Sequence, residues 1–571
     1  MTVRGSGSPK VLLELVAALT LAAACGRGEA PADLVFRGGA IYTVDAARPS
    51  AEAVAVRDGR IVFVGDAAGA ADWIGADTEV VELAGRLLLP GFHDTHVHPV
   101  SGGVELGECD LNPASSIEDV ERIIQACVAR EPDAPWLRGG GFQLPLFPDG
   151  APSKELLDRL VPDRPAFVTS ADGHTGWANS RALALAGVTR ATADPPPDGV
   201  IVRDAAGEPQ GTLRERAMDL VGRRMPPYNH VQTRAGLERA LEMAASFGLT
   251  TLHEASAGEA YLRAYQAAES AGTLTARVIV ALATDPDKGA AQVTDLVALR
   301  DRFRGTLVRP SAVKIFADGV IEGGTAALLE PYLDRPGFRG ELRWPPEELA
   351  AMVAALDQAG FAAHIHAIGD RAIRVSLDAI EAARRSRGRA GGPRHILAHI
   401  QLFDPADIPR LQGLDVVASF QPLWAYADTY ITELTEPRLG PARSRWLYPI
   451  RSVVETGAVV AGGSDWSVTT MNPLPAIEVG IRRRDPDEDD GQAWIPEEQV
   501  DLETMIRLYT MGGATAGGLD AETGSITSGK AADLVVLDRN LFEIPPHEVG
   551  DARVVLTVFG GRVVFRRDAG R

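Results

Sequence analysis

Short apolar runs alternate with amphipathic stretches through the middle of the chain. Apolar positions recurring every three or four residues predict helices at 234–247, 346–359, 370–385 and 444–456. The apolar runs predict strands at 87–93, 249–254, 276–283, 312–317, 361–367, 395–401, 415–420 and 458–463. Strands that alternate with helices in this way predict an α/β fold, a parallel (β/α)8 barrel of the TIM type, with its chemistry at the carboxyl ends of the strands.

The two ends of the chain carry a different pattern. In residues 33–88 and 520–567, apolar and polar residues alternate in short runs between Gly and Asp turns, which is typical of strands. Neither piece is long enough to bury a sheet by itself. We therefore expect one small β-sandwich domain formed from both ends, with the barrel at 89–519 between them.

The stretch from about 103 to 230 separates the first two strands of the predicted barrel. It is too long for a loop, and it contains Pro- and Gly-rich turns together with the segment Asp-Gly-His-Thr-Gly-Trp-Ala-Asn-Ser at 172–180. We expect an inserted subdomain here, and specificity would depend on its loops.

Composition and charge restrict the class of partner. The 571 residues are 45% hydrophobic and 23% charged, which is ordinary for a globular protein with a large core. The formal net charge of −20 gives no electrostatic footprint for nucleic acid. We therefore expect a small-molecule partner.

The first 25 residues are interpreted as an export signal. Arg4 and Lys10 precede an apolar stretch that ends at Cys25, which resembles a bacterial lipoprotein signal and implies a lipid anchor on Cys25 at the periplasmic side of the cell envelope. The stretch is shorter than the ~20 residues of a membrane span. The alternative is a disordered or mis-started N-terminus. Cys109 and Cys127, 18 positions apart, predict neither a disulfide framework nor a zinc-binding spacing.

Polar side chains occur at the ends of the predicted barrel strands. His96 and His98 follow the first strand, and side chains two apart on a strand point to the same face, so both imidazoles can bind one ion. Carboxyl ends of barrel strands face a shared mouth, so the sequence predicts a metal site there. The other polar residues at or near strand ends are Lys314, His364, His366, His395, His399 and Asp465.

Seven motifs together give a more specific indication. They are Pro90–His98, Asp172–Ser180, Val313–Gly319, His366–Asp370, Arg394–Gln401, Gly462–Asp465, and the closing pair Gly524–Ile526 with Gly529–Leu534. On these motifs the chain resembles the amidohydrolase superfamily over roughly residues 33–566. Within it, the chain is similar to the branch of large metal-dependent hydrolases that includes N-substituted formamide deformylases.

The resemblance implies a ligand set for one or two divalent ions. His96 and His98 would bind one ion, and His366 and His399 would bind a second. Lys314 would be carboxylated by carbon dioxide and bridge the two, because an unmodified ammonium would repel the cations. Imidazole and carboxylate ligands make zinc the leading candidate, with other divalent ions remaining open.

The resemblance also implies a mechanism. Metal coordination lowers the pKa of water from ~15.7 to near 7. Asp465 would bind metal, hold the catalytic water, take its proton and deliver that proton to the leaving amine. The metal and a nearby donor, either His174 or His253, would polarise the substrate carbonyl.

Several alternatives stay open at this stage. Lys314 is also interpretable as an interior lysine paired with Asp318, His174 as a residue that only bonds within the insertion, and His253 as a support for a ligand. The preferred function is hydrolysis of a non-peptide carbon–nitrogen bond, in an amide or an N-acyl or N-formyl amine. The rivals are a deaminase, which would release ammonia, and a catalytically silent small-molecule-binding lipoprotein.

Overall fold

The computed structural model describes residues 1–2, 30–387, 391–488 and 490–568. The predicted lipid attachment point, Cys25, lies outside these ranges. Within them, no helix combines the length and the apolar character that crossing a membrane requires.

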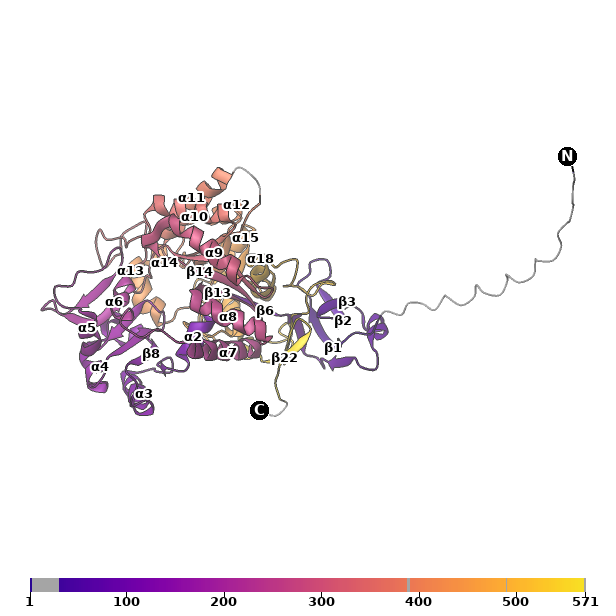
Figure 1. The fold of residues 1–571 in the computed structure, drawn as a ribbon, viewed down its shortest axis with the longest axis horizontal. Coiled ribbons are helices and arrows are strands. Elements are labelled where there is room, and N and C mark those ends of the chain that lie inside the picture. The colour runs from indigo at the N-terminus through magenta and orange to yellow at the C-terminus, as the bar shows by residue number, and fades with distance from the viewer. Residues whose placement is uncertain (3–29, 388–390, 489, 569–571) are drawn as a thin grey trace.

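The centre of the molecule is a sheet of eight parallel strands, which confirms the predicted barrel (Figure 1). Its edge strands are joined by hydrogen bonds from Thr95 Oγ1 to Gly462 O at 2.9 Å and from Asp465 N to His96 O at 2.7 Å. The strands, in their order around the barrel, are β6 (Phe92–Val97), β13 (Leu249–Ala257), β14 (Arg277–Ala283), β15 (Val308–Phe316), β16 (Ala362–Ala367), β17 (Ile396–His399), β18 (Val417–Phe420) and β19 (Val460–Gly462).

Amphipathic helices follow several of the strands, as their sequence pattern predicts. In α7, for example, the buried residues include Leu237, Ala240, Leu241 and Ala244, at the three- and four-residue spacing of one helix face. The helix predicted at 444–456 is shorter, because Pro449 precedes it. The helices named here are α7 (His230–Ser246), α8 (Glu259–Ala271), α9 (Val293–Phe303), α10 (Pro346–Ala359), α11 (Asp370–Arg387) and α15 (Ile450–Glu455).

The first predicted strand, 87–93, is two strands that belong to different sheets. Gly91 separates β5 (Leu87–Pro90) from β6, and a Cβ at this position would lie 2.3 Å from Thr250 Oγ1. The hydrogen-bond partner also changes here, because Gly91 N donates to Asp533 O whereas the next amide donates to Gly248 O. The single-strand prediction is therefore wrong, and the chain enters the barrel at Phe92.

A second eight-stranded sheet combines strands from both ends of the chain. Figure 1 shows the early β1–β3 and the late β22 on the same side of the barrel. The strand order is β22-β21-β20-β5-β1-β2-β3, with β4 pairing beside β1. The bounds are β1 (Leu34–Tyr42), β2 (Ser50–Arg57), β3 (Arg60–Gly65), β4 (Glu79–Glu82), β20 (Leu534–Leu537), β21 (Val554–Phe559) and β22 (Arg562–Arg566).

A third sheet, of six strands, lies between α2 (Pro99–Glu105) and α7 in the sequence, and on the opposite side of the barrel from β1–β3 (Figure 1). Its order is β11-β12-β10-β9-β8-β7. The bounds are β7 (Cys109–Asp110), β8 (Leu137–Phe142), β9 (Ala166–Ser170), β10 (Thr175–Ala178), β11 (Val200–Arg203) and β12 (Pro209–Arg214), with helices α3 (Ile117–Arg130), α4 (Lys154–Leu160), α5 (Ser180–Ala186) and α6 (Met218–Gly222).

The cysteines of this region are paired, contrary to the expectation from their spacing. A disulfide joins Cys109 of β7 to Cys127 of α3. Cys127 lies on the same buried helix face as Val120 and Ile124, so packing of α3 against the sheet brings the two sulfur atoms together. The number of residues between the two cysteines does not indicate that α3 packs against the sheet in this way.

Candidate metal centre

A cavity of about 200 Å³ opens at the carboxyl ends of the barrel strands. The loops of the six-stranded sheet complete its wall through Asn112, Gly141 and residues 169–174. The predicted site residues that line it are His96, His98, His174, Lys314, His366, His399 and Asp465. Segments from five barrel strands and the insertion therefore meet at one small space.

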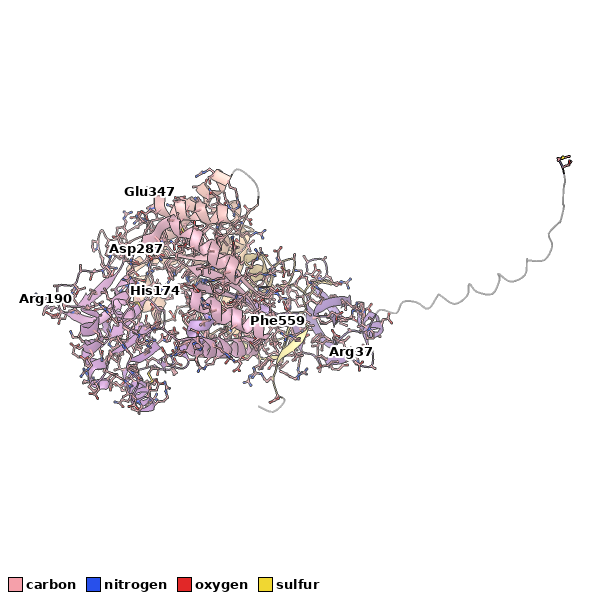
Figure 2. The ribbon with its side chains drawn as sticks, viewed as in Figure 1. Arg37, His174, Arg190, Asp287, Glu347 and Phe559 are labelled. Carbon is pink, nitrogen blue, oxygen red and sulfur yellow. A yellow bond between two sulfur atoms is a disulfide. The ribbon has the colours of Figure 1, made fainter. Side chains whose placement is uncertain are left out.

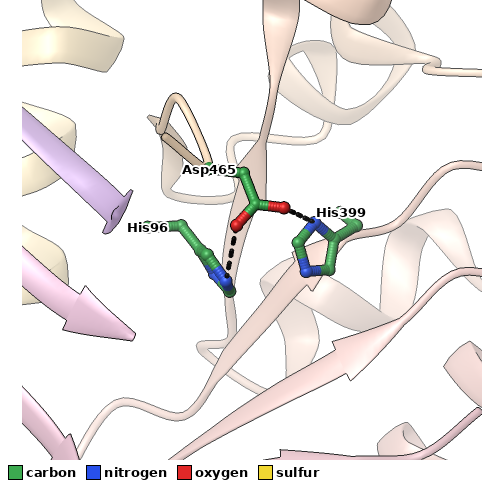
Figure 3. A group of neighbouring side chains, drawn as sticks. All are labelled: His96, His399 and Asp465. Atoms are coloured by element: carbon green, nitrogen blue, oxygen red, sulfur yellow. Dashed lines mark ion pairs between the residues drawn. The ribbon is translucent and has the colours of Figure 1, made fainter. Parts of the chain in front are cut away.

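Asp465 lies at the centre of this group. Its Oδ1 atom is 3.2 Å from His98 Nε2 and 3.5 Å from His96 Nε2, and its Oδ2 atom is 3.8 Å from His399 Nδ1. Figure 3 shows the carboxylate between the rings of His96 and His399. One ligand atom from each of these three residues lies within 4.8 Å of the others, a spacing at which a single metal ion can be held.

Backbone strain is concentrated at two of these residues. His399 has a φ of +72° and Asp465 has a φ of +55°, in the left-handed region that residues with a Cβ rarely adopt. Such conformations cost about 1–3 kcal/mol each and persist only where the surrounding structure holds them. His399 is the last residue of β17 and Asp465 follows the end of β19 by three residues, and both side chains line the cavity.

Two groups orient the ring of His96. Lys314 Nζ lies 2.9 Å from His96 Nε2, and His364 Nε2 lies 2.8 Å from His96 Nδ1. Nε2 is the ring nitrogen on the side of Asp465, whose Oδ1 atom is 3.5 Å away.

Two other imidazoles are oriented in the same manner. His366 Nε2 donates to Gly319 O at 3.1 Å, which leaves the lone pair on Nδ1. His399 Nδ1 donates to Gln421 Oε1 at 2.9 Å, which leaves the lone pair on Nε2, and Trp424 stacks on the ring at 5.8 Å between centroids. Histidines that bind metals usually donate their second nitrogen to such an oxygen.

Burial keeps most of these imidazoles neutral. It lowers the pKa of His96 and His366 far below the ordinary value and lowers the pKa of His399 to about 3. His98 differs: burial opposes its charged form, but the hydrogen bond and the charge of Asp465 outweigh burial and raise its pKa.

The two other ionisable groups also have shifted pKa values. Burial lowers the pKa of Lys314 to about 7, so its amine is partly uncharged near neutrality. For Asp465, burial favours the protonated acid, yet the electrostatic interactions with His399 and His98 and the His98 hydrogen bond prevail and lower its pKa. Asp465 is therefore ionised at neutral pH.

Two buried carboxylates, for which the sequence pattern predicted no such role, hold the frame of the site. Asp94 accepts hydrogen bonds from the amides of His96 and Ser464 at 3.1 and 3.0 Å, and so links the ends of β6 and β19. Asp318 accepts from the amides of Ile368 and Gly369 at 3.0 and 2.9 Å, which fixes the turn after β16. The alternative in which Asp318 pairs with Lys314 is therefore wrong. The sequence signal for this role is that Asp94 and Asp318 lie within the motifs Pro90–His98 and Val313–Gly319.

His98 has a second acidic neighbour, Glu254, which directly follows the predicted site residue His253 on β13. Glu254 Oε1 lies 3.8 Å from His98 Nδ1, and Tyr265 donates to Glu254 Oε2 at 2.8 Å. His253, one residue earlier on β13, points the other way, to the backbone of Gly517. Both of its ring nitrogens are buried, and it is missing from the described residues that line the cavity. The expected contact of His253 with substrate is therefore wrong, because its ring lies deeper in the barrel, against Gly517.

The structure also distinguishes His366 from His364 and His399 from His395, which share a strand face in each pair by their spacing. His366 lines the cavity, whereas His364 lies behind His96. His399 lines the cavity, whereas His395 Nε2 lies 3.2 Å from Asp357 Oδ1 and its Nδ1 accepts from Ala363 N.

His174 approaches from the insertion. Its ring centroid lies 5.2 Å from that of His366, and its Nδ1 lies 2.9 and 3.1 Å from the two oxygens of Glu215. Figure 2 labels His174 well inside the molecule, in contrast to Arg190 at the outer end of the insertion.

The donor set fits a divalent cation. Neutral imidazole nitrogens and an ionised carboxylate converge, with the second nitrogens of His96, His366 and His399 each held by another group. A positive ion between these lone pairs would replace their mutual repulsion with attraction. Imidazole and carboxylate together are typical zinc ligands.

Comparisons with known proteins agree with this geometry. The model of the amidohydrolase family matches residues 79–565. Protein LONG AFTER FAR-RED 3 of Arabidopsis thaliana is 31% identical over 545 residues, covering 94% of this chain and 92% of that protein. N-substituted formamide deformylase of Arthrobacter pascens is 28% identical over 557 residues, covering 94% and 98%.

A solved structure shares both the fold and part of the sequence. The crystal structure of an uncharacterized metal-dependent hydrolase from Pyrococcus furiosus aligns with a TM-score of 0.68 at 25% identity, covering 89% of this chain and 99% of that one. The family match spans most of the chain, including every barrel strand and all the residues that line the cavity. The chain therefore belongs to the amidohydrolase family and is a hydrolase that acts on carbon–nitrogen bonds.

Proposed function

We propose that the protein hydrolyses a small N-acyl or N-formyl amine to a carboxylic acid and an amine, with a divalent metal centre in the cavity. The observation that carries the proposal is the convergence of the predicted ligands on one cavity. Its volume of about 200 Å³ is below the ~300–1,000 Å³ of common ligand pockets, which favours a small substrate. The similarity to a formamide deformylase supports the bond type.

The residues that would hold the metal are His96, His98, His366, His399, Asp465 and a carboxylated Lys314, and zinc is the ion we propose. A divalent ion there lowers the pKa of bound water and polarises a carbonyl. Asp465, ionised and central, would accept a proton from the attacking water as the oxygen–carbon bond forms. It would return that proton to the amine nitrogen as the carbon–nitrogen bond breaks.

His174 would donate a hydrogen bond to the substrate carbonyl from the insertion side. Its ring lines the cavity beside His366, and the pairing with Glu215 outweighs burial and raises its pKa, which favours the protonated donor. Groups that stabilise developing negative charge on a carbonyl oxygen contribute strongly to such reactions.

Lys314 is suited to carboxylation by its surroundings. The uncharged amine is the form that attacks carbon dioxide, forming a nitrogen–carbon bond and releasing a proton, and burial increases the population of this form. The product would be an anion with two oxygens, carried on the nitrogen that lies 2.9 Å from His96 Nε2, where an ammonium would repel a metal ion.

The proposed reaction is tested by incubating metal-replete protein with a panel of N-formyl and N-acyl amines. We expect stoichiometric release of acid and amine, and Asp465→Asn should lower kcat by about 10²–10⁴-fold because the proton carrier is lost. Release of ammonia from aminated rings instead would indicate a deaminase. Tight binding without turnover would indicate a binding protein.

The metal assignment is tested by a matched pair of histidine variants. His399→Asn should weaken metal binding by more than ~10-fold, since loss of an outer hydrogen-bond partner alone costs ~10–100-fold. His395→Asn, in the neighbouring buried position outside the cavity, should retain the metal content of wild type. Metal analysis of the folded proteins checks both, and equal metal content in the two variants would contradict the assignment.

Carboxylation of Lys314 is tested by loading the protein with metal in ¹³C-bicarbonate. A ¹³C carbamate resonance should appear in wild type and be missing in Lys314→Arg. A fully metal-loaded protein without this resonance would refute the modification.

We further propose that the chain is exported and anchored through Cys25. The sequence pattern before Cys25 motivates the proposal, and the Cys109–Cys127 disulfide supports it, because disulfides persist mainly in oxidising compartments. In bacteria grown with labelled fatty acid, wild type should carry label and Cys25→Ser should not. Equal labelling would remove the lipoprotein proposal.

A further inference from the structure

The loop that carries His174 is held in a defined conformation. It connects β9 to β10, and Asp172 Oδ1 accepts a hydrogen bond from His174 N at 3.1 Å. Gly173 has a φ of +73°, which permits the tight turn. This conformation directs His174 out of the six-stranded sheet and into the wall of the cavity.

Glu215, the first residue after β12, binds His174 twice. Its backbone amide donates to His174 O at 3.1 Å, and its carboxylate oxygens lie 2.9 and 3.1 Å from His174 Nδ1. The first contact fixes the position of the backbone, and the second fixes the rotation of the ring. Glu215 itself has a φ of +51°, a strained conformation that must be held by its surroundings.

The barrel holds the Glu215 carboxylate from the other side. Thr325 Oγ1 donates to Glu215 Oε1 at 2.7 Å, and Arg343 forms a hydrogen-bonded ion pair with Oε2. Both donors belong to the segment between β15 and α10. The carboxylate is 2% exposed and thus joins the insertion to the barrel next to the cavity.

We propose that Glu215 is a positioning residue for the reaction and acts through His174. Because Glu215 occupies Nδ1, Nε2 is the ring nitrogen through which His174 bonds the substrate. The barrel segment that carries Thr325 and Arg343 thereby sets where the insertion presents the imidazole of His174 to the substrate. The inference rests on the proposed function for the substrate contact made by His174.

A purely structural role for Glu215 would have different consequences for activity, and Asp198 provides the control. Asp198 is also a buried acid and forms an ion pair with Arg343, as Glu215 does. It belongs to the same charge network but is not among the hydrogen-bond partners of His174 in the described chain. If Glu215 only stabilised the fold, Asp198→Asn and Glu215→Gln would have equivalent effects.

The test is a double-mutant cycle on the metal-loaded full-length enzyme, with kcat, KM, metal content and thermal unfolding measured for each variant. His174→Ala should lower kcat by ~10²-fold, the loss typical of one carbonyl-stabilising donor. Glu215→Gln should lower kcat by ~10-fold in the presence of His174 and have no further effect in His174→Ala. Asp198→Asn should retain kcat within ~2-fold of wild type.

Two results would overturn the proposal. One is a Glu215→Gln effect that multiplies fully with that of His174→Ala, and the other is an equal loss of kcat in Asp198→Asn. If Glu215→Gln does not fold, Glu215→Asp, which keeps the charge but shortens the reach, replaces it with the same expected dependence on His174.

A readout without turnover separates this proposal from the proposed function. In protein labelled with ¹⁵N-histidine, the signals lost in His174→Ala identify the ring nitrogens of His174. Glu215→Gln should shift the Nδ1 signal and Asp198→Asn should leave it in place. An unchanged Nδ1 signal in Glu215→Gln would refute positioning even if the panel contains no substrate.

Discussion

Electron-rich groups crowded into a small buried space are the constraint on which the rest of this structure depends. Asp465 lies within 4 Å of three imidazoles, and burial keeps His96 and His399 uncharged. A buried anion crowded among lone pairs is costly, and a bound cation converts that cost into binding energy. The strained backbone at His399 and Asp465 shows that the fold holds these groups together against local preference.

The fold produces this crowding through the closure of the barrel. The last strand, β19, lies beside the first, β6, and Asp94 accepts hydrogen bonds from backbone amides at the ends of both strands. His96 and Asp465, 369 positions apart along the chain, are thereby joined by a backbone hydrogen bond of 2.7 Å. The insertion then adds His174 from outside the barrel, held by Glu215. The proposed metal ligands therefore come from the barrel, while the wall of the cavity is shared with the insertion.

Strand periodicity carried most of the information available from the sequence. Alternation predicts that His96 and His98 share a face, and short apolar runs locate the barrel strands, because both depend only on neighbouring residues. Periodicity does not fix depth along the barrel axis, so His253 was expected at the cavity although its ring is buried beneath it. The break at Gly91 depends on the close approach of Thr250, which is a tertiary contact.

Glu215 and the paired cysteines were beyond local pattern for the same reason. Glu215 meets His174 across 41 positions and three strands, and Cys127 meets Cys109 only where α3 packs back against β7. A divalent cation bound in the cavity is tested most directly by a crystal structure of metal-replete protein, with anomalous diffraction recorded at the absorption edge of the metal. We expect an anomalous peak coordinated by His96, His399 and Asp465. An empty site at saturating metal, or a peak bound elsewhere, would contradict the account.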